Sequence, residues 1–155
     1  KWMSSKNALE LINGNLFAHG GIHPDIADSK LSLDEINQVI QSNYYKPSYP
    51  KKEKNIEQLL TSTKTGICWY RGYFKDDLTQ EQVDRGLDKF KAKTIVVGHT
   101  LQSKVNKIYN GKVIGIDIFH PKDYHKNWPN GKSEGLLIEN NKYYRVFADG
   151  QKEEI

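Results

Sequence analysis

The chain has 155 residues, a formal net charge of +4, 27% charged residues and a mean hydropathy of −0.73. These values argue against a membrane protein, because no apolar run approaches the roughly 20 residues that cross a bilayer. The single cysteine, Cys68, excludes an internal disulfide and favours a cytoplasmic location, which the sequence otherwise leaves open. A chain of this length is expected to form a single domain, here over residues 1–155, that buries about 70% of the surface exposed in its unfolded form.

The positive charge indicates anionic partners in general, phosphate esters included. The densest basic group comprises Lys46, Lys51, Lys52 and Lys54, and it lies beside prolines that are typical of a loop. A nucleic-acid surface requires clustered basic residues interleaved with aromatic ones, and the lysines of this chain are spread out instead. We therefore do not expect nucleic acid as a partner.

The first third of the chain predicts a helix, a strand and a second helix. Residues 4–12 carry apolar side chains and end at Asn13-Gly14, which favours a short helix with a C-terminal cap. The apolar run before His19 predicts a buried strand. Ser32 and Glu35 form a capping box, so the next helix is expected from 32 to about 43.

Two more helices and two hairpins follow. Residues from about 53 to 63 place apolar side chains on one face, and Thr79 with Gln82 forms a capping box before another amphipathic helix. Asn110-Gly111 predicts the turn of a hairpin over 105–118, and Asn140-Asn141 the turn of a second hairpin over 135–147. Residues 121–132 read as a long polar loop. The expected fold class is mixed α/β (α+β), with helices followed by β-hairpins.

Two short blocks carry the chemistry of the sequence. One is Phe-Ala-His19-Gly-Gly, and the other is Val-Val-Gly-His99-Thr. Each places a histidine at the end of an apolar strand, where α/β proteins build their active sites. Neutral imidazole is a common ligand of zinc and related metals, so the pair predicts a metal centre, although no carboxylate cluster stands beside either histidine.

These blocks resemble a known family when they are taken in order. His19-Gly-Gly-Ile-His-Pro, Trp69-Tyr-Arg-Gly-Tyr, Gly98-His99-Thr, Val113-Ile-Gly-Ile-Asp117 and a closing hairpin are similar to the C-terminal half of a calcineurin-like metallophosphoesterase. The resemblance is closest to bacterial relatives of the Ser/Thr protein phosphatases, including the Shewanella-like phosphatases. It implies a two-sheet β-sandwich flanked by helices, a dinuclear metal centre, and hydrolysis of phosphomonoesters.

The resemblance also implies roles for individual residues. His19 and His99 match two later histidines of the family that bind metal, and Arg71 is implied to hold the phosphate because its planar fork bonds two oxygens. Asp117 is the candidate for orienting one of the imidazoles without itself binding the metal. The implied substrate is a phosphorylated protein or a small phosphoester, and the implied cofactors are two Mn, Fe or Zn ions in each intact site.

Three blocks of the family are absent from these 155 residues: D-x-H, G-D-x-x-D-R-G and G-N-H-E. Asp84-Arg85-Gly86 mimics part of one but falls inside an expected helix, so we interpret it as coincidence. A bridged metal pair needs a carboxylate between its cations, which two histidines do not supply. The chain is therefore expected to lack its native N-terminus, to have little hydrolytic activity alone, and to self-associate through exposed sheet edges.

Other interpretations remain open at this point. The histidines could be hydrogen-bonded structural residues, Arg71 could stack on its aromatic neighbours, and Asp117 could simply end a strand. Cys68 is better explained as a structural thiol than as a nucleophile. The chain could also be a non-catalytic binding module with the same fold or, as the least favoured of the three functions, a basic nucleic-acid-binding domain.

Overall fold

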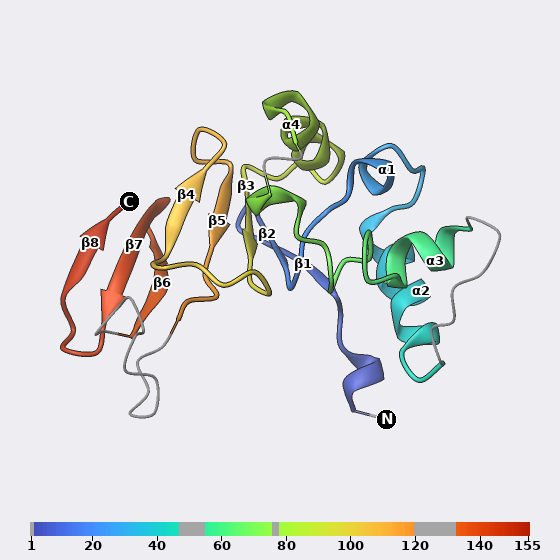
Figure 1. Cartoon of the computed structure of the whole chain (residues 1–155), viewed down its shortest axis with the longest axis horizontal. Helices are drawn as coiled ribbons and strands as arrows, with labels where there is room; N and C mark the ends of the chain where they lie inside the picture. The colour runs from blue at the N-terminus through green and yellow to red at the C-terminus, as the bar shows by residue number, and fades with distance from the viewer. Residues whose placement is uncertain (1, 47–54, 76–77, 120–132) are drawn as a thin grey trace.

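The computed structural model describes residues 2–46, 55–75, 78–119 and 133–155. Within these residues, strands form two sheets, and helices cover one side of the larger sheet (Figure 1). The larger sheet has the order β1-β2-β3-β5-β4, in which β2, β3 and β5 are mutually parallel and the outer strands are antiparallel to their neighbours. The smaller antiparallel sheet has the order β6-β7-β8.

The bounds of the elements are as follows. The larger sheet comprises β1 (Leu9–Ile12), β2 (Asn15–Ala18), β3 (Thr94–Val97), β4 (Asn106–Ile108) and β5 (Val113–Gly115), and the smaller sheet comprises β6 (Glu134–Glu139), β7 (Lys142–Phe147) and β8 (Lys152–Glu154). The helices are α1 (Pro24–Ala27), α2 (Leu33–Asn43), α3 (Ile56–Thr61) and α4 (Gln80–Lys89), with short 3-10 turns η1 (Met3–Ser5) and η2 (Gly72–Phe74).

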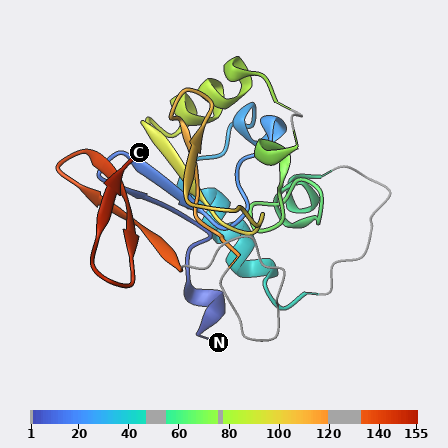
Figure 2. The same cartoon turned by 60° about the vertical axis from the view of Figure 1, so that its left-hand side comes forward.

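The alternation of side chains along β3 divides the interior into two layers, because successive residues of a strand point to opposite faces. Ile95 and Val97 are buried in the cluster that includes the helices, whereas Val96 joins the cluster that includes Leu136 and Ile138 of β6. Figure 2 shows the smaller sheet on the side of the larger sheet that the helices do not cover. The expected two-sheet sandwich flanked by helices is therefore confirmed.

The helices begin where their capping residues predict. The Ser32 hydroxyl accepts a hydrogen bond from the Glu35 amide, and the Glu35 carboxylate accepts one from the Ser32 amide. Thr79 and Gln82 make the same reciprocal pair at α4. The expected segment from 53 to 63 yields a shorter helix, α3, which Asn55 caps through its side chain. No helix among the described residues is long and apolar enough to cross a membrane.

The prediction of a helix over residues 4–12 was wrong. Leu9–Ile12 forms β1, which pairs antiparallel with β2 so that Ile12 lies opposite Asn15. Asn13 and Gly14 both have positive φ, 52° and 81°, as the two central residues of a type I′ hairpin turn require. The Asn-Gly pair thus makes a hairpin turn instead of a helix cap, and a hairpin precedes the helices.

The two later hairpins form where they were expected, but the turn of the first is longer than predicted. β6 and β7 enclose a two-residue turn in which Asn140 and Asn141 both have positive φ. In the β4–β5 hairpin the last pair is Ile108 with Val113, so four residues, 109–112, form the loop instead of two. β8 was not expected. The predicted polar loop at 121–132 lies outside the described residues.

Asn37 of α2 attaches the helical layer to β1. It is 3% exposed, its Oδ1 accepts from the amides of Ala8 and Leu9 at 2.9 Å, and its Nδ2 donates to the Leu9 carbonyl at 2.9 Å. These bonds satisfy backbone groups on the outer edge of β1, which would otherwise be buried without partners.

Replacing Asn37 by Leu is expected to lower the free energy of unfolding by about 3 kcal/mol, because several buried backbone groups lose their partners. Urea denaturation measures the change. Gln38→Leu, at an exposed position of the same helix, is the control and should change stability by less than about 0.5 kcal/mol. Equal effects of the two substitutions would contradict this role for Asn37.

Candidate active site

Three neighbouring parallel strands end at the same edge of the larger sheet. His19 follows β2 directly, Gly98-His99 follows β3, and Asp117 lies two residues after the end of β5. The backbone connects these strand ends: the Gly98 amide donates to the His19 carbonyl at 2.9 Å, and the Ile116 amide to the Val97 carbonyl at 2.9 Å. Ligand sites of α/β sheets lie at this edge, beyond the carboxyl ends of the strands.

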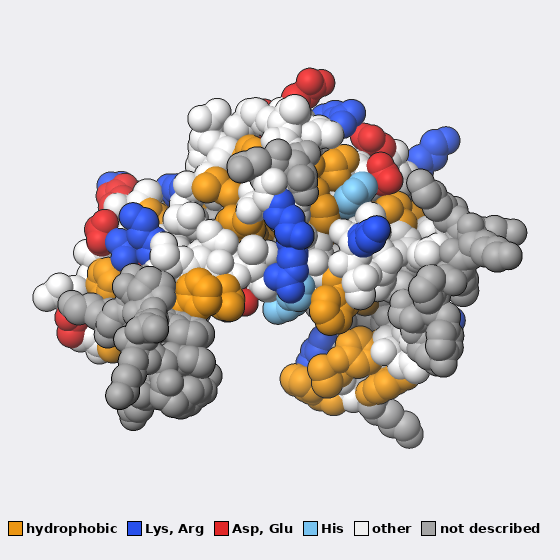
Figure 3. Space-filling model, in the orientation of Figure 1, with side chains coloured by type: hydrophobic (Ala, Val, Ile, Leu, Met, Phe, Trp, Pro, Cys, Tyr) orange, Lys and Arg blue, Asp and Glu red, His pale blue; other side chains and the backbone are white. Residues whose placement is uncertain are grey.

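The pairing of β2 with β3 brings the two histidines of the sequence motifs together across 80 residues of chain. Nδ1 of His99 and Nε2 of His19 are 3.2 Å apart, and the ring centroids are 4.9 Å apart. In the space-filling view, histidine surface lies at the head of a hollow at the lower edge of the molecule, below basic side chains (Figure 3). The expected juxtaposition of His19 and His99 at strand ends is present.

The backbone at His99 is strained. Its φ is 62°, and the Thr100 amide donates to the Gly98 carbonyl at 2.7 Å, so His99 is the central residue of a tight three-residue turn. Turns of this kind with positive φ are rare for residues other than glycine, and strained residues concentrate at functional sites. Arg71 supports the turn, because its Nη1 donates to the His99 carbonyl at 2.7 Å.

The electrostatic environment favours the neutral form of the His99 imidazole. Burial lowers its pKa below the usual range, the Arg71 guanidinium and the His19 ring lower it further, and Asp117 opposes them. A neutral imidazole retains the nitrogen lone pair that a metal or a proton requires. Nε2 of His99 is buried and has no hydrogen-bond partner among the described residues.

Gly20 allows the segment that carries Trp69 and Arg71 to lie directly on the histidine turn. The amides of Gly20 and Gly21 both donate to the Ile67 carbonyl, at 2.8 and 3.0 Å. A Cβ at Gly20 would lie only 2.7 Å from the Tyr70 amide nitrogen and 2.9 Å from that of Trp69. This close approach places the Trp69 ring edge-on to His99, with centroids 5.3 Å apart, while Trp69 remains 48% exposed.

Asp117 lies close to the pair on the side of Gly98. A Cβ built at Gly98 would lie 3.7 Å from the Asp117 Cβ and 3.8 Å from Nδ1 of His19, so these two side chains border the same position. Asp117 acts on His99 through its charge, and in the described part of the chain its carboxylate makes no hydrogen bond to either imidazole.

The donor set fits part of a metal site. Two imidazole nitrogens bound to one zinc at about 2.0–2.1 Å lie roughly 2.9–3.4 Å apart, which includes the 3.2 Å between His19 and His99. Two nitrogens are fewer than a stable site needs, and within residues 2–46, 55–75, 78–119 and 133–155 no group of three or more His, Cys, Asp or Glu side chains converges. The pair therefore suits two ligand positions of a larger set.

Solved structures of phosphatases are similar to this chain. Two solved structures of cold-active protein tyrosine phosphatase, one described as coming from a psychrophilic Shewanella species, are each 35% identical to this chain and match 99% of it, with TM-scores of 0.81 and 0.82. This likeness is consistent with the resemblance of the sequence motifs to the calcineurin-like phosphoesterase superfamily. It spans only 43% and 44% of their respective lengths.

Other comparisons add little. A protein serine/threonine phosphatase from Saccharomyces cerevisiae with similarity to human phosphatase PP5 is 18% identical over 94% of the chain and 41% of its own length, with a TM-score of 0.49, which is too low to support an argument. No family model matches the chain, and no curated protein does.

Sequence reasoning missed several features of this candidate site. The Gly20-Gly21 pair signals close backbone approach, but its partner, the 67–70 segment, was not identifiable from the sequence. His23 caps α1, because its Nδ1 accepts a hydrogen bond from the Asp25 amide at 3.1 Å, and no motif of the sequence indicated this role. Burial raises the pKa of the Cys68 thiol, which fits the expected structural role. Asp84-Arg85-Gly86 lies within α4, as expected for a coincidental motif.

Gly20→Ala is expected to destabilise the fold by about 2–3 kcal/mol, because the new methyl group would meet backbone atoms that have no room to move. The change in free energy of unfolding in urea tests this. Gly86→Ala is the matched control: it lies within α4, where a Cβ would approach only Ile22 at 3.9 Å, and helix propensity should stabilise the variant by up to about 1 kcal/mol. An unchanged free energy of unfolding in Gly20→Ala would contradict the close packing of the 67–70 segment on Gly20.

Proposed function

We propose that this chain contributes part of the active site of a metal-dependent phosphatase that hydrolyses phosphomonoesters. The observation that carries the proposal is the His19–His99 pair at the carboxyl edge of parallel strands, next to Arg71, in a fold shared over 99% of the chain with protein tyrosine phosphatase structures. We propose further that the chain is the C-terminal portion of the metallophosphoesterase domain. The missing carboxylate ligands then come from another segment.

His19 and His99 would hold one divalent cation, Mn, Fe or Zn, through the two nitrogens that face each other. Their 3.2 Å separation and the neutral state of His99 support this role. A dinuclear centre of such cations, when bound, supplies an activated water and neutralises charge on the phosphoryl oxygens. The short turn at residues 98–100 fixes the direction of the His99 ring, and Arg71 holds that turn in place.

Arg71 would bind the phosphate of the substrate. Its Nη1 is engaged by the His99 carbonyl, which fixes the guanidinium plane beside the imidazole and leaves further N–H groups for an anion. An arginine fixed in this way can present two parallel donors to phosphoryl oxygens. The substrates would be phosphorylated proteins or small phosphoesters.

Asp117 would act as a positioning residue. Its negative charge raises the proton affinity of His99 and so offsets part of the effect of Arg71 and His19. This balance makes the imidazole a better donor to a cation than burial beside Arg71 alone would allow. The role rests on charge and proximity, because its side chain is placed beside Gly98 between the strand ends.

Two further expectations follow from the missing carboxylates. The isolated chain should turn over p-nitrophenyl phosphate only slowly, since the described residues offer no third ligand to the cation. Self-association through the outer edges of β1 and β4 stays a prediction, and the exposed Leu11 and Ile12 of β1 fit it. A metal-free binding module is the alternative that these observations leave open.

Arg71→Met is expected to weaken binding of inorganic phosphate by at least tenfold in the presence of Mn²⁺, because the charged fork is lost. Isothermal titration calorimetry measures the affinity, and p-nitrophenyl phosphate turnover is recorded on the same preparation. The control is Arg85→Met. Arg85 lies on α4 and forms an exposed ion pair with Asp28, so this variant should bind phosphate like the unmodified chain.

Two results would count against the proposal. Equal phosphate affinity in the Arg71 and Arg85 variants would remove Arg71 from the phosphate site. Rapid turnover by residues 1–155 alone, with no added segment, would show that the site needs no further carboxylates.

A further inference from the structure

Exposed apolar and aromatic side chains gather where η1 packs against the C-terminal end of α2. Trp2 is 73% exposed, Met3 53%, Tyr44 43% and Tyr45 65%. Single exposed side chains of this size are ordinary, but a contiguous group of them marks a contact surface. In Figure 3, hydrophobic side chains lie together at the lower edge of the molecule, over the position that η1 occupies in Figure 1. We call these four residues the η1–α2 patch.

Contacts between the side chains make the η1–α2 patch one continuous surface. The Tyr44 hydroxyl donates to Sδ of Met3 at 3.4 Å, and the rings of Tyr44 and Tyr45 meet edge to face with their centroids 5.2 Å apart. Nε2 of Gln41 donates to the Lys6 carbonyl at 3.3 Å, which joins α2 to the segment that follows η1. The fold therefore forms this surface before any partner arrives.

The charge beside the η1–α2 patch is positive. Residues 2–7 and 41–46, which carry the patch, include Lys6 and Lys46 and contain no aspartate or glutamate. Both lysines are exposed. Nζ of Lys6 lies 4.7 Å from the centre of the Trp2 ring, so its charge stands directly on the patch. A complementary partner offers negative charge next to apolar groups.

The residue types of the η1–α2 patch favour a lipid surface over another protein. Tryptophan and tyrosine combine an apolar ring with a polar group, and they are enriched where a membrane meets water. Lysine is depleted from protein–protein interfaces. At a membrane, the lysine stem lies along apolar surface while its ammonium reaches the headgroups, and anionic headgroups attract it.

We propose that the η1–α2 patch binds the surface of an anionic phospholipid bilayer, with Trp2 and Tyr45 in the interface and Lys6 and Lys46 against the headgroups. The low hydropathy of the chain argues only against segments that cross a bilayer, and a surface contact needs none. The inference does not rest on the proposed phosphatase function. Because the hollow below the histidine surface opens at the same edge of the molecule (Figure 3), a bound chain would present that hollow toward the membrane.

The test is sedimentation of residues 1–155 with vesicles of phosphatidylcholine alone or of equal parts of phosphatidylcholine and phosphatidylglycerol, at physiological salt. The chain should bind the mixed vesicles and bind phosphatidylcholine much more weakly. Trp2→Ala should weaken binding to the mixed vesicles about tenfold, because a large apolar side chain no longer enters the interface. Lys6→Glu should also weaken it about tenfold, because repulsion replaces attraction.

Matched controls separate the η1–α2 patch from the overall properties of the chain. Lys30→Glu makes the same change in net charge at an exposed position between α1 and α2, and Ile56→Ala shortens an apolar side chain of α3 that is 37% exposed. Both controls should bind the mixed vesicles like the unmodified chain. Thermal melting of every variant checks that it is folded.

Four results would overturn the lipid surface. The first is no binding to the mixed vesicles, and the second is equal binding to both kinds of vesicle. The third is equal affinity of Trp2→Ala and the unmodified chain, and the fourth is equal losses in Lys6→Glu and Lys30→Glu, which would show an effect of net charge alone. Light scattering without vesicles tests a different occupant: a dimer of the unmodified chain that Trp2→Ala abolishes would assign the patch to a second copy and contradict the proposal.

Discussion

The parallel pairing of β2 with β3 is the constraint on which the rest of the structure depends. It places Ala18 opposite Val97, so the strands end together and the Gly98 amide reaches the His19 carbonyl. The two histidines, 80 residues apart in sequence, meet as a result. Buried side chains on both faces of β3 hold this register, because a shift by one residue would exchange the faces that contact the helices and the second sheet.

The backbone conformation around these two strand ends then shapes the candidate site. His99 adopts a positive φ that costs free energy, and Arg71 offsets part of this cost by bonding its carbonyl. Gly20 lets the 67–70 segment approach closely, while Gly115 keeps space between Phe74 and Asn106. The two histidines, the strained turn and Arg71 are thereby gathered at one edge of the sheet.

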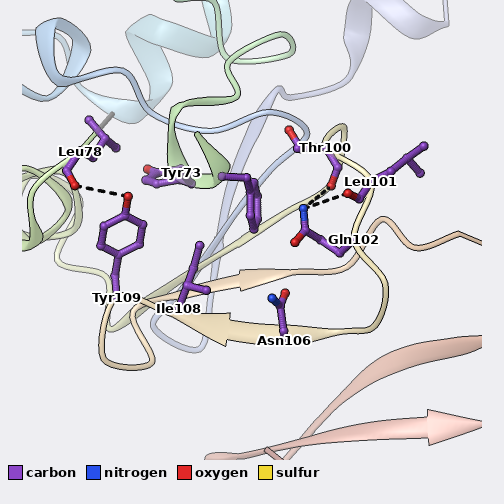
Figure 4. A pocket seen from close by; sticks show the side chains of 9 residues that line it. Tyr73, Leu78, Thr100, Leu101, Gln102, Asn106, Ile108 and Tyr109 are labelled. Atoms are coloured by element: carbon purple, nitrogen blue, oxygen red, sulfur yellow. Dashed lines mark hydrogen bonds between the residues drawn. The ribbon is translucent and has the colours of Figure 1, made fainter. Parts of the chain in front are cut away.

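The sequence predicted the parts of the fold that local chemistry determines. Capping boxes at Ser32 and Thr79 identified two helices, and the two motif histidines lie together at strand ends, as their position in the motifs predicted. Reasoning from local sequence failed where tertiary pairing decides the structure. Asn13-Gly14 suits the end of a helix and the turn of a hairpin equally well, and only the pairing of β1 with β2 selects the hairpin turn. A cavity lined in part by Thr100, Asn106 and Phe74 (Figure 4) was not predictable, because these residues come from three separate segments with no shared motif.

The central claim is that His19 and His99 bind one cation together, and titration of residues 1–155 with Zn²⁺, followed through the imidazole ¹⁵N shifts, tests it most directly. The account predicts that Nε2 of His19 and Nδ1 of His99 shift together, and that His19→Gln or His99→Gln abolishes the shared response. His23→Asn, which retains a helix-capping residue, should leave it intact. Separate responses of the two histidines, or unchanged zinc binding in both variants, would contradict the claim.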